Sequence, residues 1–149
     1  MPTKVVGWKK GDFVACAGAE FANHADIICV PENLAVRISD DRFLKQSSIA
    51  TIGAIALQGI RRAELKIGEK VCVFGLGLLG QLTVQLAKLS GCQVFGLDIE
   101  NKKLDLAKKF GADYVFDSKK EDFINEIDFA TYNHGVDTVI ITASASSGE

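Results

Sequence analysis

Three glycines and one acid have the types and spacing of a nucleotide-binding site. Gly75, Gly77 and Gly80 form the pattern G-x-G-x-x-G, and Asp98 stands at the end of the next apolar run. In a dinucleotide site the first glycine permits a tight turn. The second lets the backbone approach a pyrophosphate, and the third lets a helix pack closely on a sheet. The acid accepts hydrogen bonds from ribose hydroxyls. These residues therefore predict a site for an adenine dinucleotide.

The glycines need a strand before them and a helix after them, because glycines punctuate turns in many unrelated folds. Apolar residues over 70–74 predict a buried strand, and leucines at helical spacing predict a helix over 78–89. A second strand over 93–97 would deliver the acid. The backbone amides of Leu78 and Leu79 would open the helix and meet the phosphate charge.

Asp98 and the residues before the glycines distinguish between the candidate ligands. A carboxylate at Asp98 would repel a 2′-phosphate, so the sequence favours NAD over NADP. A methyltransferase usually carries an acidic residue just before its glycines, whereas Val73 and Phe74 stand there in this chain. The remaining alternative is a glycine-rich turn in an α/β protein that binds no nucleotide.

Strands and helices alternate through the rest of this region. Ser118 and Glu121 have the spacing of a capping box, which predicts that the last helix begins near residue 118. The alternation predicts an α/β fold with a Rossmann-type parallel sheet. We expect this sheet to be incomplete, because the chain supplies the first four strands of a fold that has six. The further elements are expected at residues 102–110 (helix), 114–116 (strand), 118–129 (helix) and 137–143 (strand).

The first part of the chain has a different pattern, which places a domain boundary near residue 45. Residues 1–45 predict strands and turns: one strand after the turn at Gly11, and two in ADIICVPENLAVRISD that are separated by Pro31. One or two helices are expected over 42–64. Residues 46–149 would then form a partial Rossmann NAD-binding domain with a preceding linker helix.

Composition and charge exclude several classes of protein. The chain has 149 residues and a net charge of −2, which gives no reason to expect a nucleic acid or membrane partner. The apolar run over 49–57 is far shorter than the roughly 20 residues that a membrane span needs. No two cysteines form a C-x-x-C pair, and three of the four lie in apolar runs, where a buried thiol packs as a small apolar group. A disulfide framework is not expected in a chain of this size, which favours a reducing cytoplasm.

The order of several segments resembles the medium-chain, zinc-type alcohol dehydrogenases. The resemblance covers nearly the whole chain through GDFVACAG, HADIICVPENLAVRI, ATIGAIALQGI and GVDTVIITAS, and it is strongest from Leu65 to Asp113. In detail it is similar to the branch fused to a glucose–fructose-oxidoreductase-like module. The resemblance implies a GroES-like catalytic domain, here a short β-rich remnant, followed by a Rossmann domain. It also implies hydride transfer between NAD(P) and a small alcohol or carbonyl substrate.

The resemblance assigns cofactor-binding positions residue by residue. Lys103 matches a basic residue that reaches the adenosine ribose, and Ile99 would lie beside the adenine. Thr142 and Ala143 match residues that line the cofactor cleft. The full set is Gly75, Gly77, Leu78, Leu79, Gly80, Asp98, Ile99, Lys103, Thr142 and Ala143.

The metal ligands of the family are not matched. Its catalytic zinc takes a cysteine just ahead of the Rossmann domain, yet no cysteine lies between Cys29 and Cys72. A zinc site needs three or four convergent ligands. His24 and His134 are therefore interpreted as structural or solvated residues, and Cys16 as a packing residue. We expect no zinc in this chain and assign no catalytic residue.

Three functional hypotheses follow. The first is an NAD(P)-dependent oxidoreductase represented by part of a longer enzyme, with the isolated chain inactive. The second is a non-catalytic NAD-binding or redox-sensing module, and the third is a scaffold that binds no adenine nucleotide. The apolar strand over 137–143 is expected to have an unpaired edge, which predicts a homo-oligomer. A monomer in light scattering at high concentration would contradict that association.

Overall fold

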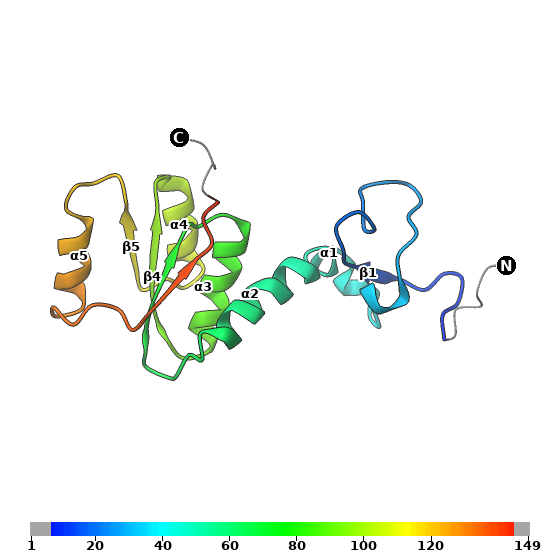
Figure 1. The fold of residues 1–149 in the computed structure, drawn as a ribbon, viewed down its shortest axis with the longest axis horizontal. Helices are drawn as coiled ribbons and strands as arrows, with labels where there is room; N and C mark the ends of the chain where they lie inside the picture. The colour runs from blue at the N-terminus through cyan, green and yellow to red at the C-terminus, as the bar shows by residue number, and fades with distance from the viewer. Residues whose placement is uncertain (1–6, 145–149) are drawn as a thin grey trace. The chain divides into compact units, whose positions relative to one another are not determined.

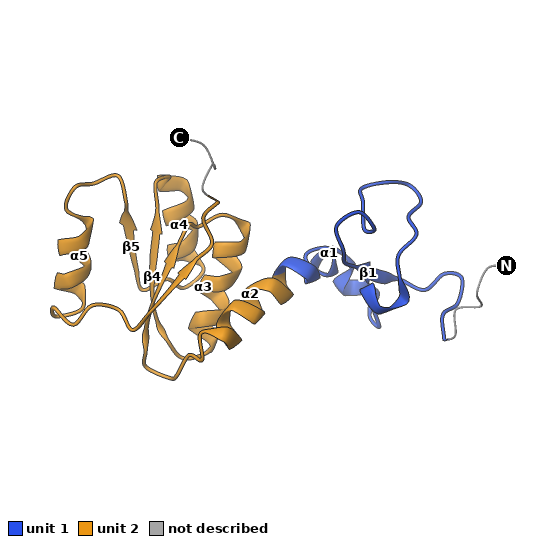
Figure 2. Cartoon of the chain, viewed as in Figure 1, with its two compact units in different colours: residues 1–52 blue, residues 53–149 orange. Residues whose placement is uncertain are grey.

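The chain divides into two compact units, residues 1–52 and residues 53–149 (Figure 2). The computed structural model describes residues 7–144. Among these residues, no helix has the length and apolar character needed to cross a membrane.

The first unit is built from short elements. Strand β1 (Val14–Cys16) pairs antiparallel with β2 (Ala35–Arg37), and Ala15 faces Val36 in this pair. The 3-10 turn η1 (Glu32–Leu34) leads into β2. A second 3-10 turn and a single helical turn follow: η2 (Asp41–Phe43) and α1 (Leu44–Ser47).

One strand predicted in this unit does not form. The apolar residues before Pro31 have no strand assignment, and the side chain of Ile27 is 90% exposed. The prediction was wrong because strand propensity is largely a preference for a pleated, half-buried surface. The pair of β1 and β2 offers little such surface, so only the strand after Pro31 forms, as β2.

The second unit alternates helices and strands in the predicted order (Figure 1). All pairings in its sheet are parallel, and the strand order is β5-β4-β3-β6, so the predicted α/β fold with a Rossmann-type sheet is confirmed. The elements are α2 (Ala50–Arg62, which begins in the first unit), β3 (Lys70–Phe74), α3 (Leu78–Leu89), β4 (Gln93–Asp98), α4 (Asn101–Lys109), β5 (Tyr114–Asp117), α5 (Phe123–Ala130) and β6 (Thr138–Ile141).

The sheet has a different apolar cluster on each face, because successive residues of a strand point to opposite sides. Val71 and Val94 pack on one face with Val84 of α3 and Leu104 of α4. The other face carries the ring of Phe95, with further rings and the apolar side of α5 packed against it. The first cluster includes Leu76 of the glycine turn, and the second includes Leu97, the residue before Asp98.

Helix α5 begins later than the capping box predicts. A side-chain oxygen of Asp117 accepts a hydrogen bond from the backbone N–H of Lys119 at 3.0 Å, and Lys120 N donates to the Asp117 carbonyl at 3.1 Å. These bonds close a turn directly after β5, and such local bonds compete with helix formation. The predicted start at Ser118 was therefore wrong, and the helix begins at Phe123.

Strand β6 lies at one end of the sheet. In the described part of the chain it pairs with β3 alone, and the side chains of Val139 and Ile141 are 55% and 70% exposed. The predicted association of copies of the chain through this edge stays a prediction.

Candidate nucleotide-binding site

The glycine turn joins β3 to α3 under tight steric limits. Gly75 has φ of +93°, and a Cβ built on it would lie 2.5 Å from the backbone nitrogen of Ala143. A Cβ on Gly80 would lie 2.0 Å from the carbonyl oxygen of Gly75. A Cβ on Gly77 would meet no atom within 4 Å. Packing therefore requires the first and third glycines, whereas the second leaves the backbone open to an approaching ligand.

Helix α3 begins without a protein cap. Gly77 is its N-cap residue, no side chain caps it, and its first turn contains no acidic residue. The first N–H groups of a helix have no partner within the helix, and they lie at its positive end. The amides of Leu78 and Leu79 are among these groups. The turn therefore presents donors suited to an anion.

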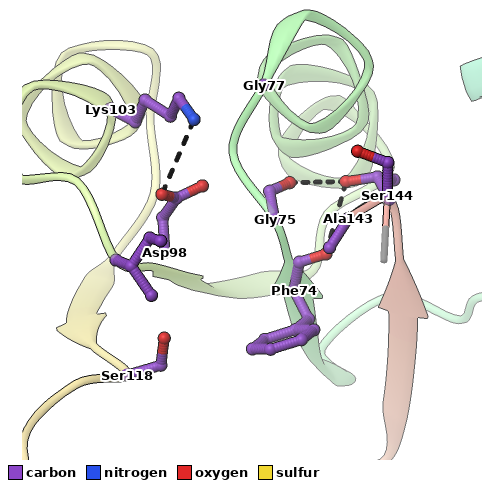
Figure 3. Close-up of a pocket in the computed structure, with 10 residues that line it drawn as sticks. Phe74, Gly75, Gly77, Asp98, Lys103, Ser118, Ala143 and Ser144 are labelled. Atoms are coloured by element: carbon purple, nitrogen blue, oxygen red, sulfur yellow. Dashed lines mark hydrogen bonds and ion pairs between the residues drawn. The ribbon is translucent and has the colours of Figure 1, made fainter. Parts of the chain in front are cut away.

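Asp98 is the last residue of β4, and its carboxylate is held in place. It is 7% exposed, and its Oδ2 accepts a hydrogen bond from the backbone N–H of Leu76 at 2.7 Å. Its Oδ1 accepts from the backbone N–H of Glu100 at 3.0 Å. The Lys103 Nζ lies 3.8 Å from the same Oδ1, as Figure 3 shows. The acid is thus tied to the glycine turn as well as to the start of α4.

Lys103 carries its charge beside this acid. Its Nζ donates to Glu100 Oε1 at 2.7 Å, and this hydrogen bond raises the pKa of Lys103 above its usual value, with Asp98 acting in the same direction. The ammonium group is therefore charged at neutral pH. It places a hydrogen-bond donor next to the acceptor oxygens of Asp98.

These residues surround one hollow with a volume of about 250 Å³, at the ends of the parallel strands (Figure 3). Three predicted residues do not line it: Leu78 and Leu79, which were predicted for their backbone amides, and Gly80, which packs behind the turn. The lining residues are Phe74, Gly75, Gly77, Asp98, Ile99, Lys103, Ser118, Thr142, Ala143 and Ser144.

Sequence reasoning missed three lining residues: Phe74, Ser118 and Ser144. Phe74 ends β3, Ser118 follows β5 directly, and Ser144 comes after β6. Ligands of open α/β sheets bind outside the carboxyl ends of the strands. Applying that rule to the last residue of each predicted strand, and to the residues directly after it, would have found them.

The described residues, 7–144, do not bring metal ligands together. Within this range no group of three or more His, Cys, Asp or Glu side chains could hold a metal ion. Burial raises the pKa of Cys72 to about 11, so its thiol stays protonated at neutral pH. The side chains in this range do not fit the zinc site of the resembled family.

The parallel sheet and the glycine turn define a Rossmann-type domain, and comparisons with known proteins agree. Residues 79–147 match the family described as zinc-binding dehydrogenase. An uncharacterized zinc-type alcohol dehydrogenase-like protein of Escherichia coli is 28% identical over 120 residues, which are 80% of this chain and 35% of that protein. D-guloside 3-dehydrogenase of Escherichia coli is 37% identical over 89 residues, 59% of this chain and 25% of that enzyme.

A solved structure described as a zinc-binding dehydrogenase from Clostridium scindens has a TM-score of 0.71 and 31% identity, covering 76% of this chain and 32% of that one. The chain therefore matches a zinc-binding dehydrogenase domain over residues 79–147 and is similar to proteins named as zinc-type alcohol dehydrogenase-like. It spans about a third or less of the length of these relatives. The predicted fusion to a glucose–fructose-oxidoreductase-like module stays a prediction.

Proposed function

We propose that the hollow beside the glycine turn binds the adenosine diphosphate part of NAD. The observation that carries this proposal is the uncapped start of α3 facing an open Gly77, with the fixed carboxylate of Asp98 on the neighbouring strand. The amides would receive the phosphates, and Asp98 with Lys103 would bind the ribose hydroxyls. The carboxylate would disfavour a 2′-phosphate, which supports NAD as the cofactor.

We further propose that the chain serves an oxidoreductase that transfers a hydride between NAD and an alcohol or carbonyl compound. The match to a zinc-binding dehydrogenase domain supports this, and one similar protein is named D-guloside 3-dehydrogenase. The nicotinamide would supply the hydride chemistry. The residues of this chain would hold the adenosine and the phosphates, so that binding energy can orient the reacting ring.

A titration series tests the binding proposal. Calorimetry of the chain with NAD, NADP and ADP-ribose should give similar affinities for NAD and ADP-ribose and a lower one for NADP. Asp98→Asn should lower NAD affinity by about 1–3 kcal/mol, the range for a hydrogen bond to a charged group. It should also reduce the preference over NADP.

The control is Asp105→Asn, which removes an exposed acid of α4 that does not line the hollow. Its affinity for NAD should equal that of the parent. A parent chain that binds neither NAD nor ADP-ribose would contradict the proposal. A non-catalytic NAD-binding module would give the same titrations but no oxidation of an alcohol in the complete protein.

A further inference from the structure

Gln81 links two segments that border the hollow. It belongs to α3, is 6% exposed, and its amide nitrogen Nε2 donates to the Leu76 carbonyl at 3.0 Å and to the Lys103 carbonyl at 2.9 Å. Leu76 lies in the glycine turn and Lys103 in α4. Both N–H bonds of the side chain are therefore used on backbone outside its own helix.

The oxygen of the same side chain has no partner in the described part of the chain. Gln81 Oε1 is buried and accepts no hydrogen bond. A buried acceptor without a donor costs free energy. Reversing the amide would place its oxygen against two carbonyls, so the two donated bonds fix its orientation. The side chain thus donates to two carbonyls while its own oxygen accepts no hydrogen bond.

These contacts close a ring around the candidate site. The backbone N–H of Leu76 donates to Asp98 Oδ2 at 2.7 Å, and Lys103 Nζ lies 3.8 Å from Asp98 Oδ1. The carbonyls of Leu76 and Lys103 are joined through Gln81. Both polar backbone groups of Leu76 are therefore held from outside the turn. A shift of this turn would therefore stretch or break its hydrogen bonds to Asp98 and Gln81.

We propose that Gln81 is a positioning residue for this site, which sets the glycine turn relative to α4 before a ligand arrives. The inference rests on the proposed function, because it concerns the adenosine diphosphate site. Gln81 does not line the hollow and acts through Leu76 and Lys103. A site whose parts are fixed in advance loses less conformational freedom on binding, so it binds more tightly.

Gln81→Met tests the role, because methionine has a similar length but donates no hydrogen bond. Gln85→Met is the matched control: it removes a glutamine one turn further along α3, whose Nε2 donates only to the Gln81 carbonyl at 3.1 Å. Both variants are titrated with ADP and with adenosine. Gln81→Met should weaken ADP binding about tenfold, equivalent to about 1.4 kcal/mol, with a smaller loss for adenosine, which lacks phosphates. Gln85→Met should bind both like the parent.

Two further measurements separate positioning from general damage. Hydrogen exchange of the Leu76 amide in the ligand-free chain should be faster in Gln81→Met. The exchange of the amide of Val84, a fully buried residue of α3, should stay unchanged. Combining Gln81→Met with Asp98→Asn should cost less ADP affinity than the two separate losses together, because both changes open one ring.

Each outcome bears on the proposal. Parent-like ADP binding by Gln81→Met, equal losses for ADP and adenosine, or the same loss in Gln85→Met would overturn the positioning role. A parent chain that binds no ADP would overturn the proposed function instead. In that case the exchange of Leu76 still decides whether Gln81 holds the turn, and an unchanged rate would refute it.

Discussion

The two units of the chain differ in what holds them together. In the second unit Val71, Val84, Val94 and Phe95 are fully buried, and the sheet has an apolar cluster on both faces. Among the described residues of the first unit, 7–52, none is buried to this degree. Its contacts are short backbone pairings and polar bonds at the surface. The predicted site therefore lies in the unit where burial fixes the backbone.

The polar contacts of the first unit centre on Arg37. Its guanidinium lies 2.7 Å from Asp12 Oδ2 and stands over the Trp8 ring at 5.2 Å from the centroid, and Trp8 Nε1 donates to Glu32 Oε1 at 3.1 Å. Exposed ion pairs contribute little to stability, because water screens them and long side chains lose freedom. Because no side chain among residues 7–52 is buried, the stability of the first unit should be much less sensitive to loss of an apolar side chain than that of the second.

The largest effect is expected from Phe95→Ala. The Phe95 ring is fully buried and stacks on Tyr114, with ring centroids 5.0 Å apart. Removing it should lower the free energy of unfolding by about 3–5 kcal/mol, because a cavity remains in the core. Urea unfolding followed by circular dichroism measures the change. Val36→Ala, at a strand position of the first unit that is 61% exposed, should change it by less than about 0.5 kcal/mol.

The same contrast explains which elements could be predicted from sequence. Strand β3 and helix α3 have the bounds that the apolar pattern predicts, because burial on a sheet imposes that pattern. The strand expected before Pro31 failed because apolar residues alone do not supply a surface to pack on. The predicted start of α5 was wrong because the side chain of Asp117 closes a turn there. Residue spacing alone does not show whether this turn or a capping box is the more stable.

The candidate site was predictable to a similar extent. The spacing of the glycines and Asp98 predicts their roles, and the structure brings Gly75, Gly77 and Asp98 to one hollow with Lys103 and Thr142. Gly80 instead packs behind the turn. Gln81 could not be found this way, because its bonds join carbonyls of the turn and of α4. Those bonds depend on how two helices sit on the sheet. A glutamine at a helical position carries no sign of such a contact.

The cysteines offer a second test, since the two units have two each: Cys16 and Cys29, then Cys72 and Cys92. Cys29 is exposed, whereas burial raises the pKa of Cys72 to about 11. Thiolate is the reactive form, so Cys72 should react with a thiol reagent at neutral pH at least about 100-fold more slowly than Cys29. Mass spectrometry of peptides from the labelled folded chain gives both rates. Comparable rates would show that the core of the second unit opens readily, so the two units would not differ in how firmly they are packed.

The smallest expected effect is a loss of stability of the first unit at acid pH, when Asp12 becomes protonated. The backbone N–H of Lys9 donates to Asp12 Oδ2 at 2.8 Å, and this bond, with Arg37 nearby, holds the pKa of Asp12 below its usual value. A carboxyl whose pKa is lower in the folded state stabilises the fold above its unfolded pKa, about 3.9, and loses that contribution as pH falls through the folded value.

The chain has a single tryptophan, Trp8, and it reports on this unit because Arg37 contacts both its ring and Asp12. Its fluorescence should therefore change as the pH falls below about 4, the range in which free aspartate protonates. The signal should be salt-dependent, since the pair is exposed. In Asp12→Asn this acid transition should be weaker, because the group that titrates is gone. An unaltered transition in the variant would assign the acid response to other carboxyls and leave Arg37 without its proposed part in holding the first unit.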